Sequence, residues 1–173
     1  MLTNNRALII IAAVVATLLQ AIIAPHIAIG YGMPNFMAVV ALIAAVLQPQ
    51  VFRHVLPFVL GLMYDLMSGG PVGAMAFSLT AMSAFVSFFY SRANNDTLFM
   101  GIAAVLLGLL LLDLIYGMFI LLFGYASNLL EAFVFRILPC LVYDVVITAI
   151  LFPIAARFLG NNAPLRSEIT QLH

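Results

Sequence analysis

The sequence predicts an all-α, polytopic membrane protein with six transmembrane helices. Of its 173 residues, 66% are hydrophobic and 7% are charged, whereas about a quarter of the residues in a soluble domain carry charge. Six apolar windows are each close to the roughly 20 residues that cross a hydrocarbon core. There is no lysine, and when all six windows cross, every arginine except Arg136 lies on one side, which is the positive-inside pattern.

The windows are residues 7–24, 27–47, 51–67, 72–90, 98–123 and 131–158. The first follows Arg6 as a secretory signal would, but its apolar length and the windows after it indicate a retained anchor. The second is interrupted by Gly30, Gly32 and Pro34, so its uninterrupted part, 35–47, is short enough for a re-entrant segment. The third and fourth flank a glycine-rich turn. The fifth and sixth are long enough to cross, although each contains an aspartate.

Arginine positions decide whether the second window crosses. With six crossings, one side receives Arg6, Arg53, Arg92, Arg157 and Arg166. Without the second crossing, only the first of these arginines would lie inside, against the positive-inside rule. We therefore expect six helices with both termini in the cytoplasm. Residues 1–159 should form one transmembrane domain, and residues 160–173 a short mobile cytoplasmic tail.

A turn of unusual composition connects the third and fourth windows. It contains Asp65, Ser68, Gly69, Gly70, Pro71 and Gly73. Gly69 and Gly70 can take positive φ and end one helix, and Pro71 suits the first turn of the next. A carboxylate in the closing turn of a helix opposes the macrodipole. We therefore expect the turn amides or the Ser68 hydroxyl to compensate Asp65.

Two further aspartates, Asp113 and Asp144, fall near the middle of the last two windows. An ionised side chain is costly at that depth, so both should face the protein interior. Arg136 enters the last window from the outer end, at a depth close to that of Asp113. Three roles stay open: an internal ion pair or protonated carboxyls that hold helices together, a proton or substrate pathway, and a contact with a partner helix.

Several other kinds of site are not indicated. The three histidines are far apart in the sequence and have no metal-ligand spacing. The single cysteine, Cys140, lies in an apolar stretch and is best explained by packing. The zero net charge and the dispersed arginines exclude a nucleic-acid surface. We expect no cofactor, no metal and no catalytic residues.

Short motifs along the chain resemble the rod-shape-determining MreD family. The most distinctive is Gly61-x-x-x-Asp65-Leu-x-Ser68-Gly69-Gly70-Pro71-x-Gly73, which leads into a helix with scattered polar residues. Others are Pro34-Asn35-Phe36 at the start of a helix, residues 48–53, Asp113-Leu114 and Pro153. Asp144 departs from the pattern, since a small or less costly polar residue would be expected there.

The resemblance implies a compact six-helix bundle similar to the substrate-binding subunits of energy-coupling-factor vitamin transporters. It also implies a multi-pass protein of the bacterial inner (cytoplasmic) membrane, within the elongasome, the machinery that inserts peptidoglycan along the side wall. The implied direct partner is MreC. Through MreC the chain would meet MreB filaments, the RodA glycosyltransferase and a class B penicillin-binding protein. The implied role is a non-enzymatic scaffold.

Two alternatives to a scaffold are a substrate-binding subunit of a vitamin-type transporter and a membrane enzyme acting on lipid. The size, the number of windows and the intramembrane acids favour the first of these alternatives. The second needs clustered polar residues near an interface. The hydroxyl residues Ser68, Ser78, Thr80 and Ser83 are available, but no histidine or lysine base lies beside them.

Overall fold

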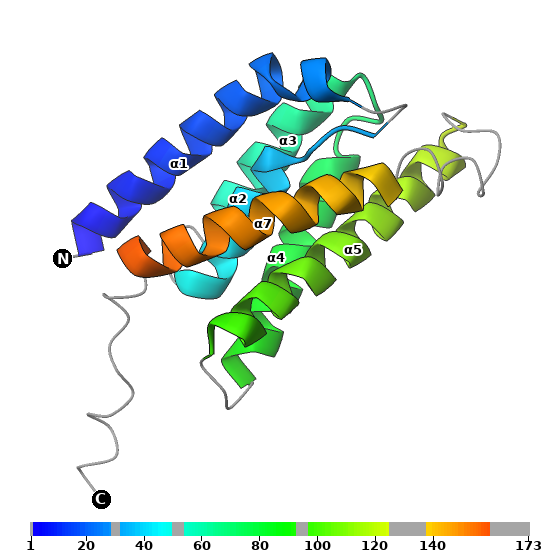
Figure 1. The fold of residues 1–173 in the computed structure, drawn as a ribbon. Helices are drawn as coiled ribbons and strands as arrows, with labels where there is room; N and C mark the ends of the chain where they lie inside the picture. The colour runs from blue at the N-terminus through cyan, green and yellow to red at the C-terminus, as the bar shows by residue number, and fades with distance from the viewer. Residues whose placement is uncertain (1, 29–31, 50–53, 93–96, 125–137, 160–173) are drawn as a thin grey trace, which may run out of the picture.

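In the computed structural model, the described residues are 2–28, 32–49, 54–92, 97–124 and 138–159, with side chains described from Arg6 onward. They form six α-helices and one 3-10 helix (Figure 1). The elements in chain order are α1 (Leu2–Ile22), η1 (Ala24–Ile27), α2 (Phe36–Leu47), α3 (Val55–Ser68), α4 (Ala74–Arg92), α5 (Leu98–Leu122) and α7 (Leu138–Leu159). The all-α class predicted from the sequence is confirmed for this part of the chain.

Three helices, α4, α5 and α7, are long and apolar enough to cross a membrane. The apolar parts of α1, α2 and α3 are shorter, at 10–17 residues. Six crossings therefore remain a prediction. The expected tail, residues 160–173, and the start of the last window, residues 131–137, lie outside the described residues.

The second window differs most from its prediction. Its α-helix begins at Phe36 rather than at residue 27, because a 3-10 turn ends at Ile27 and Gly32 to Asn35 are not helical. Pro34 explains part of this, since proline disfavours the helical conformation of the residue before it. The resulting helix has 12 residues and a length of about 18 Å, well below the roughly 30 Å of a hydrocarbon core.

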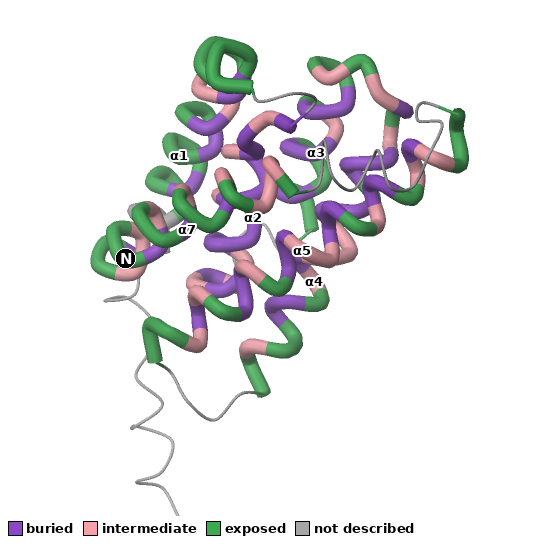
Figure 2. Tube along the Cα trace, turned by 45° about the vertical axis from the view of Figure 1, so that its right-hand side comes forward, coloured by how far each residue is buried: buried purple, intermediate pink, exposed green. Residues whose placement is uncertain are grey.

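The short helix α2 occupies the centre of the bundle. It packs against all five other α-helices of the described part, and most of its residues are buried (Figure 2). The surrounding core contains Leu42, Met75, Leu79, Leu109 and Phe152. Most of α2 is buried, and its sequence is accordingly apolar throughout rather than amphipathic.

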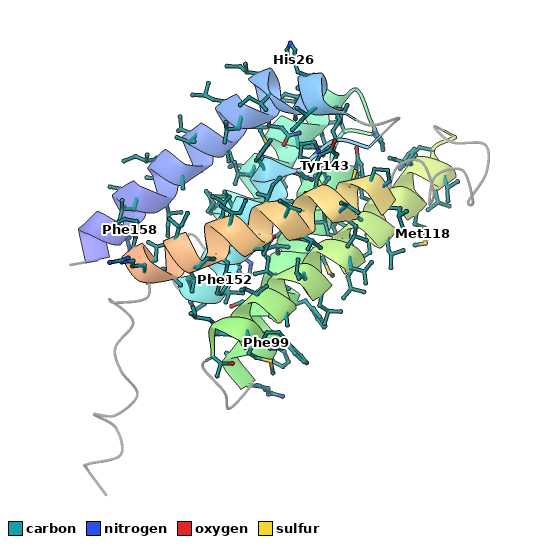
Figure 3. The ribbon with its side chains drawn as sticks, viewed as in Figure 1. His26, Phe99, Met118, Tyr143, Phe152 and Phe158 are labelled. Carbon is teal, nitrogen blue, oxygen red and sulfur yellow. The ribbon has the colours of Figure 1, made fainter. Side chains whose placement is uncertain are left out.

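The outward faces of the other helices are apolar as well. Large exposed hydrophobic side chains extend along α1, α4, α5 and α7, as the labelled Phe99, Met118 and Phe158 illustrate (Figure 3). A soluble protein seldom exposes contiguous apolar surface on this scale. The distribution fits a bundle whose outer surface meets acyl chains.

Glycines allow the helices to approach closely. A Cβ added at Gly61 of α3 would lie 2.5 Å from the Cα of Ala76 in α4. Gly101 of α5 packs on the ring of Phe152, and Gly108 of α5 packs on Val86. Small residues serve this purpose in membrane bundles, so these glycines are used for packing within the bundle.

Candidate functional site

The glycine turn between α3 and α4 ends one helix and starts the next. Gly69 is the C-cap of α3 and adopts the left-handed conformation, with φ 65° and ψ 14°. Gly73, directly before α4, has φ 94°. Gly70 does not have positive φ. The prediction was therefore right for Gly69 and wrong for Gly70, because the second left-handed position lies three residues later.

Gly70 instead lies close to a neighbouring helix. A Cβ added there would lie 2.7 Å from the hydroxyl oxygen of Tyr116 in α5. The turn is therefore fitted against α5 as well as between its own helices. Pro71 is buried in the turn, three residues before α4 begins rather than inside its first turn, and its carbonyl accepts a hydrogen bond from the amide of Ala74 at 3.2 Å.

Asp65 caps the start of α4. Its side chain is 1% exposed. Its carboxylate accepts hydrogen bonds from the amides of Gly73 at 2.8 Å, Met75 at 3.0 and 3.1 Å, and Ala76 at 3.2 Å. The first amides of a helix have no partner within the helix. The residue at the N-cap, Gly73, has no side chain with which to satisfy them.

Of the two alternatives predicted to compensate Asp65, the turn amides are confirmed through Gly73, joined by the Met75 and Ala76 amides of α4, and the Ser68 hydroxyl is not used. The Ser68 hydroxyl oxygen is buried and has no hydrogen-bond partner among the described residues. Asp65 sits in the closing turn of α3 but faces the positive end of the α4 macrodipole, which stabilises a carboxylate. The unfavourable end of one helix is therefore offset by the favourable end of the next.

A second buried carboxylate caps α2. Asp144 of α7 is fully buried, and its Oδ1 accepts a hydrogen bond from the amide of Asn35 at 3.0 Å. Asn35 is itself the N-cap, since its side-chain oxygen accepts from the amide of Ala38 at 3.0 Å. Gln20 of α1 accepts from the amide of Phe36 at 3.0 Å. Two other helices, α7 and α1, and a local cap therefore satisfy the start of α2.

Asp113 of α5 lies beside this second cap. It is 8% exposed and close enough to Asp144 to interact with it electrostatically. The two aspartates, on neighbouring helices, both face the interior. Asp65 and Asp144 cap helices.

A small polar cavity adjoins the two caps. Its lining includes Asn35, Tyr64, Asp113, Tyr116 and Cys140. The rings of Tyr64 and Tyr116 meet edge to face, with centroids 6.0 Å apart. The space available to the centre of a water-sized sphere is about 20 Å³, which accommodates about one water molecule.

Three further hydrogen bonds tie α7 to the segment that contains α2. Tyr143 donates to the carbonyl of Ile27 at 2.5 Å (Figure 3), and Cys140 donates to the carbonyl of Met33 at 3.2 Å. At the far end of α2, the Gln48 side chain donates to the carbonyl of Leu159 at 2.9 Å. Cys140 therefore does more than fill space, because its thiol donates a hydrogen bond to the carbonyl of Met33.

Two other residues singled out from the sequence are Pro34 and Arg136. Pro34 is buried next to the cap of α2. Arg136 lies outside the described residues, so its pairing with Asp113 stays a prediction. Gln20 and Gln48 were missed by the sequence reasoning, although a glutamine within or beside an apolar window is itself a signal of a buried polar contact.

The arrangement is suited to holding helices in place. The donors to Asp65 and Asp144 are backbone amides, so these carboxylates are engaged in the fold. Within the described ranges, no group of three or more histidine, cysteine, aspartate or glutamate side chains could hold a metal ion.

Comparison with protein families identifies the chain. Neither the curated proteins nor the solved structures gave a match. The sequence model described as rod shape-determining protein MreD matches residues 1–161. The match includes all six α-helices, the glycine turn and the three buried aspartates. The chain therefore belongs to the MreD family of rod shape-determining membrane proteins.

Proposed function

We propose that the protein is a non-enzymatic membrane scaffold of the bacterial cell-wall elongation machinery. In this proposal it binds MreC directly and regulates peptidoglycan synthesis through that contact. MreB, RodA and a class B penicillin-binding protein associate with it through the complex. The observation that carries the proposal is the family match over residues 1–161, since the family determines rod shape.

The chemistry of the buried aspartates supports a scaffold. Asp65 binds three backbone amides at the start of α4, and Asp144 binds one at the start of α2. A carboxylate that caps a helix fixes the position of that helix. These side chains therefore fix the positions of α2 and α4 in the bundle. Fixed helices provide the stable surface that a partner protein needs for recognition.

The transporter alternative is not supported. The polar cavity beside Asp113 accommodates about one water molecule, whereas small-molecule pockets have volumes of about 300–1,000 Å³. For this cavity to hold a vitamin-sized ligand, the caps of α2 and α4 would have to separate. The similarity to energy-coupling-factor subunits, which the family resemblance implied, remains a prediction about the fold.

The proposed location is the inner membrane, with both termini cytoplasmic and the α3–α4 turn outside. The long apolar helices α4, α5 and α7 support a multi-pass arrangement. Arg6, Arg92 and Arg157, at the start of α1 and the ends of α4 and α7, share one end of the bundle, which supports the orientation through the positive-inside rule.

Depletion and co-purification test the proposal. Removing the protein from a rod-shaped host should produce round cells, and the wild-type chain should restore rods. The tagged wild-type chain should retain MreC after mild detergent extraction. Rods that persist without the protein, or a well-folded chain that never retains MreC, would contradict the scaffold role.

A further inference from the structure

An apolar groove opens on the surface of the bundle between α1 and α7, with α2 as its floor. Its lining is entirely apolar and includes Ala12 of α1, Ile43 and Ala44 of α2, and Ile154 and Phe158 of α7. The two outer helices lie side by side above α2 (Figure 1). The volume accessible to the centre of a water-sized sphere is about 220 Å³, so the groove is far larger than the polar cavity.

The groove lies toward the arginine end of the bundle. Its lining includes Leu8 at the start of α1 and Leu159 at the end of α7. Arg6 lies two residues before Leu8, and Arg157 lies directly before Phe158. Both arginines are exposed. The described acids, Asp65, Asp113 and Asp144, are all buried.

The size of the groove and the positive charge near it indicate which kind of molecule it binds. A helix with its side chains is about 10–12 Å wide, so a groove of this volume receives a single flexible chain more readily than a helix. A surface groove in a membrane-embedded bundle faces acyl chains. Arginine side chains at the rim can extend their charged groups toward the headgroup layer, where they attract anionic lipid.

We propose that this groove binds an acyl chain of an anionic phospholipid whose phosphate is held by Arg6 and Arg157. The apolar lining recognises the chain, and the two guanidinium groups recognise the headgroup. The lipid would fill the space between α1 and α7 and so bridge the first and last helices of the described chain. This inference is independent of the proposed binding to MreC.

Tryptophan fluorescence tests the proposal directly, because the chain contains no tryptophan. Phe158→Trp places a single fluorophore in the groove, since Phe158 lines it and is 63% exposed. The control is Phe99→Trp, at the same end of the bundle but outside the groove, where Phe99 is 82% exposed (Figure 3). Each variant is placed in phosphatidylcholine vesicles with a small fraction of brominated phosphatidylglycerol or brominated phosphatidylcholine.

The groove fluorophore should be quenched more strongly by the phosphatidylglycerol, with a relative affinity about fivefold higher for each arginine that contributes. The Phe99→Trp fluorophore should show a smaller preference. Arg6→Gln with Arg157→Gln should remove the preference at the groove. Ala12→Phe should lower quenching there by both lipids, because the added ring occupies the groove.

Three outcomes would overturn the proposal. The first is an equal preference at the two positions, which would reduce the effect to general attraction of anionic lipid to the arginine end. The second is equal quenching by both lipids at the groove. The third is a preference that survives the double arginine substitution. Any of these results would favour a side chain of a partner helix as the occupant of the groove.

Discussion

At the scale of single residues, the main finding is that two buried aspartates serve as caps for helices to which they do not belong. Asp65 in α3 caps α4, and Asp144 in α7 caps α2. Unpaired amides buried away from water are costly, and the positive end of a helix favours a carboxylate. Asp65 therefore offsets both terms, whereas Asp144 accepts one amide through Oδ1 while its Oδ2 is buried without a hydrogen-bond partner among the described residues.

The first prediction separates Asp65 from its neighbour in the turn. Asp65→Ala removes every side-chain acceptor from the first amides of α4, and we expect it to lower stability by about 1–3 kcal/mol. Ser68→Ala is the matched control, since the Ser68 hydroxyl has no partner among the described residues. It should change stability by less than about 0.5 kcal/mol. Thermal unfolding in detergent measures both, and equal losses would contradict the cap.

The second prediction distinguishes a structural Asp144 from one that must titrate. Asp144→Asn keeps an oxygen that can accept from the Asn35 amide, so stability should remain within about 1 kcal/mol of wild type. Asp144→Leu leaves that amide unpaired and should cost about 1–3 kcal/mol. For each variant, the melting temperature of the purified protein and the shape of the cells that express it are measured. An Asp144→Asn protein that melts normally, retains MreC and still fails to support rods would show that the ionisable group itself is needed.

At the scale of elements, the α3–α4 hairpin is held by its close approach to other helices as much as by its turn. Gly61 allows contact with the backbone of α4, and Gly70 lies against Tyr116 of α5. Overpacking at such contacts generally destabilises a protein. The glycines are therefore not interchangeable, since Gly69 and Gly73 are needed for their backbone conformation.

The third prediction uses the contact between the turn and α5. Gly70→Ala should destabilise the bundle by about 1–3 kcal/mol, because its Cβ would press on the Tyr116 hydroxyl. Tyr116→Phe removes that oxygen and should recover part of the loss. A double-mutant cycle of melting temperatures gives the coupling between the two positions. Additive effects would mean that the turn moves away from α5 without resistance.

Helix positions were largely predictable from the sequence, and long-range contacts were not. The window 98–123 nearly coincides with α5 because twenty-five residues without proline or charge except Asp113 can only form one apolar helix. The window 27–47 was too long because Gly32 and Pro34 remove its first part. The pairing of Asp144 with Asn35 joins residues 109 positions apart. No periodicity or spacing signals such a pairing, whereas Asp65 and its donors lie within eleven residues.

At the scale of the whole molecule, the short α2 is surrounded by five helices. The outer faces of those helices are apolar, and the arginines of the described part lie at the start or end of α1, α4 and α7. This distribution supports one orientation for the bundle. It also places the α3–α4 hairpin at the end opposite to these arginines.

The fourth prediction tests that orientation. Single cysteines are placed at Gly70 and at Asn95, the latter outside the described residues, in a Cys140→Ala background. A membrane-impermeant thiol reagent applied to intact cells should label the first position and spare the second. Permeabilised cells provide the control for reactivity. Labelling at Asn95 in intact cells would reverse the assignment.

The bonds between α7 and the segment around α2 also constrain the order of assembly. The donor at Asn35 meets its acceptor only after more than a hundred further residues have been synthesised, and Gln48 waits as long for Leu159. Until α7 leaves the ribosome, the central helix lies among its neighbours with an open polar end. A chain that stops before α7 therefore lacks the acceptors for the Asn35 amide and the Gln48 side chain.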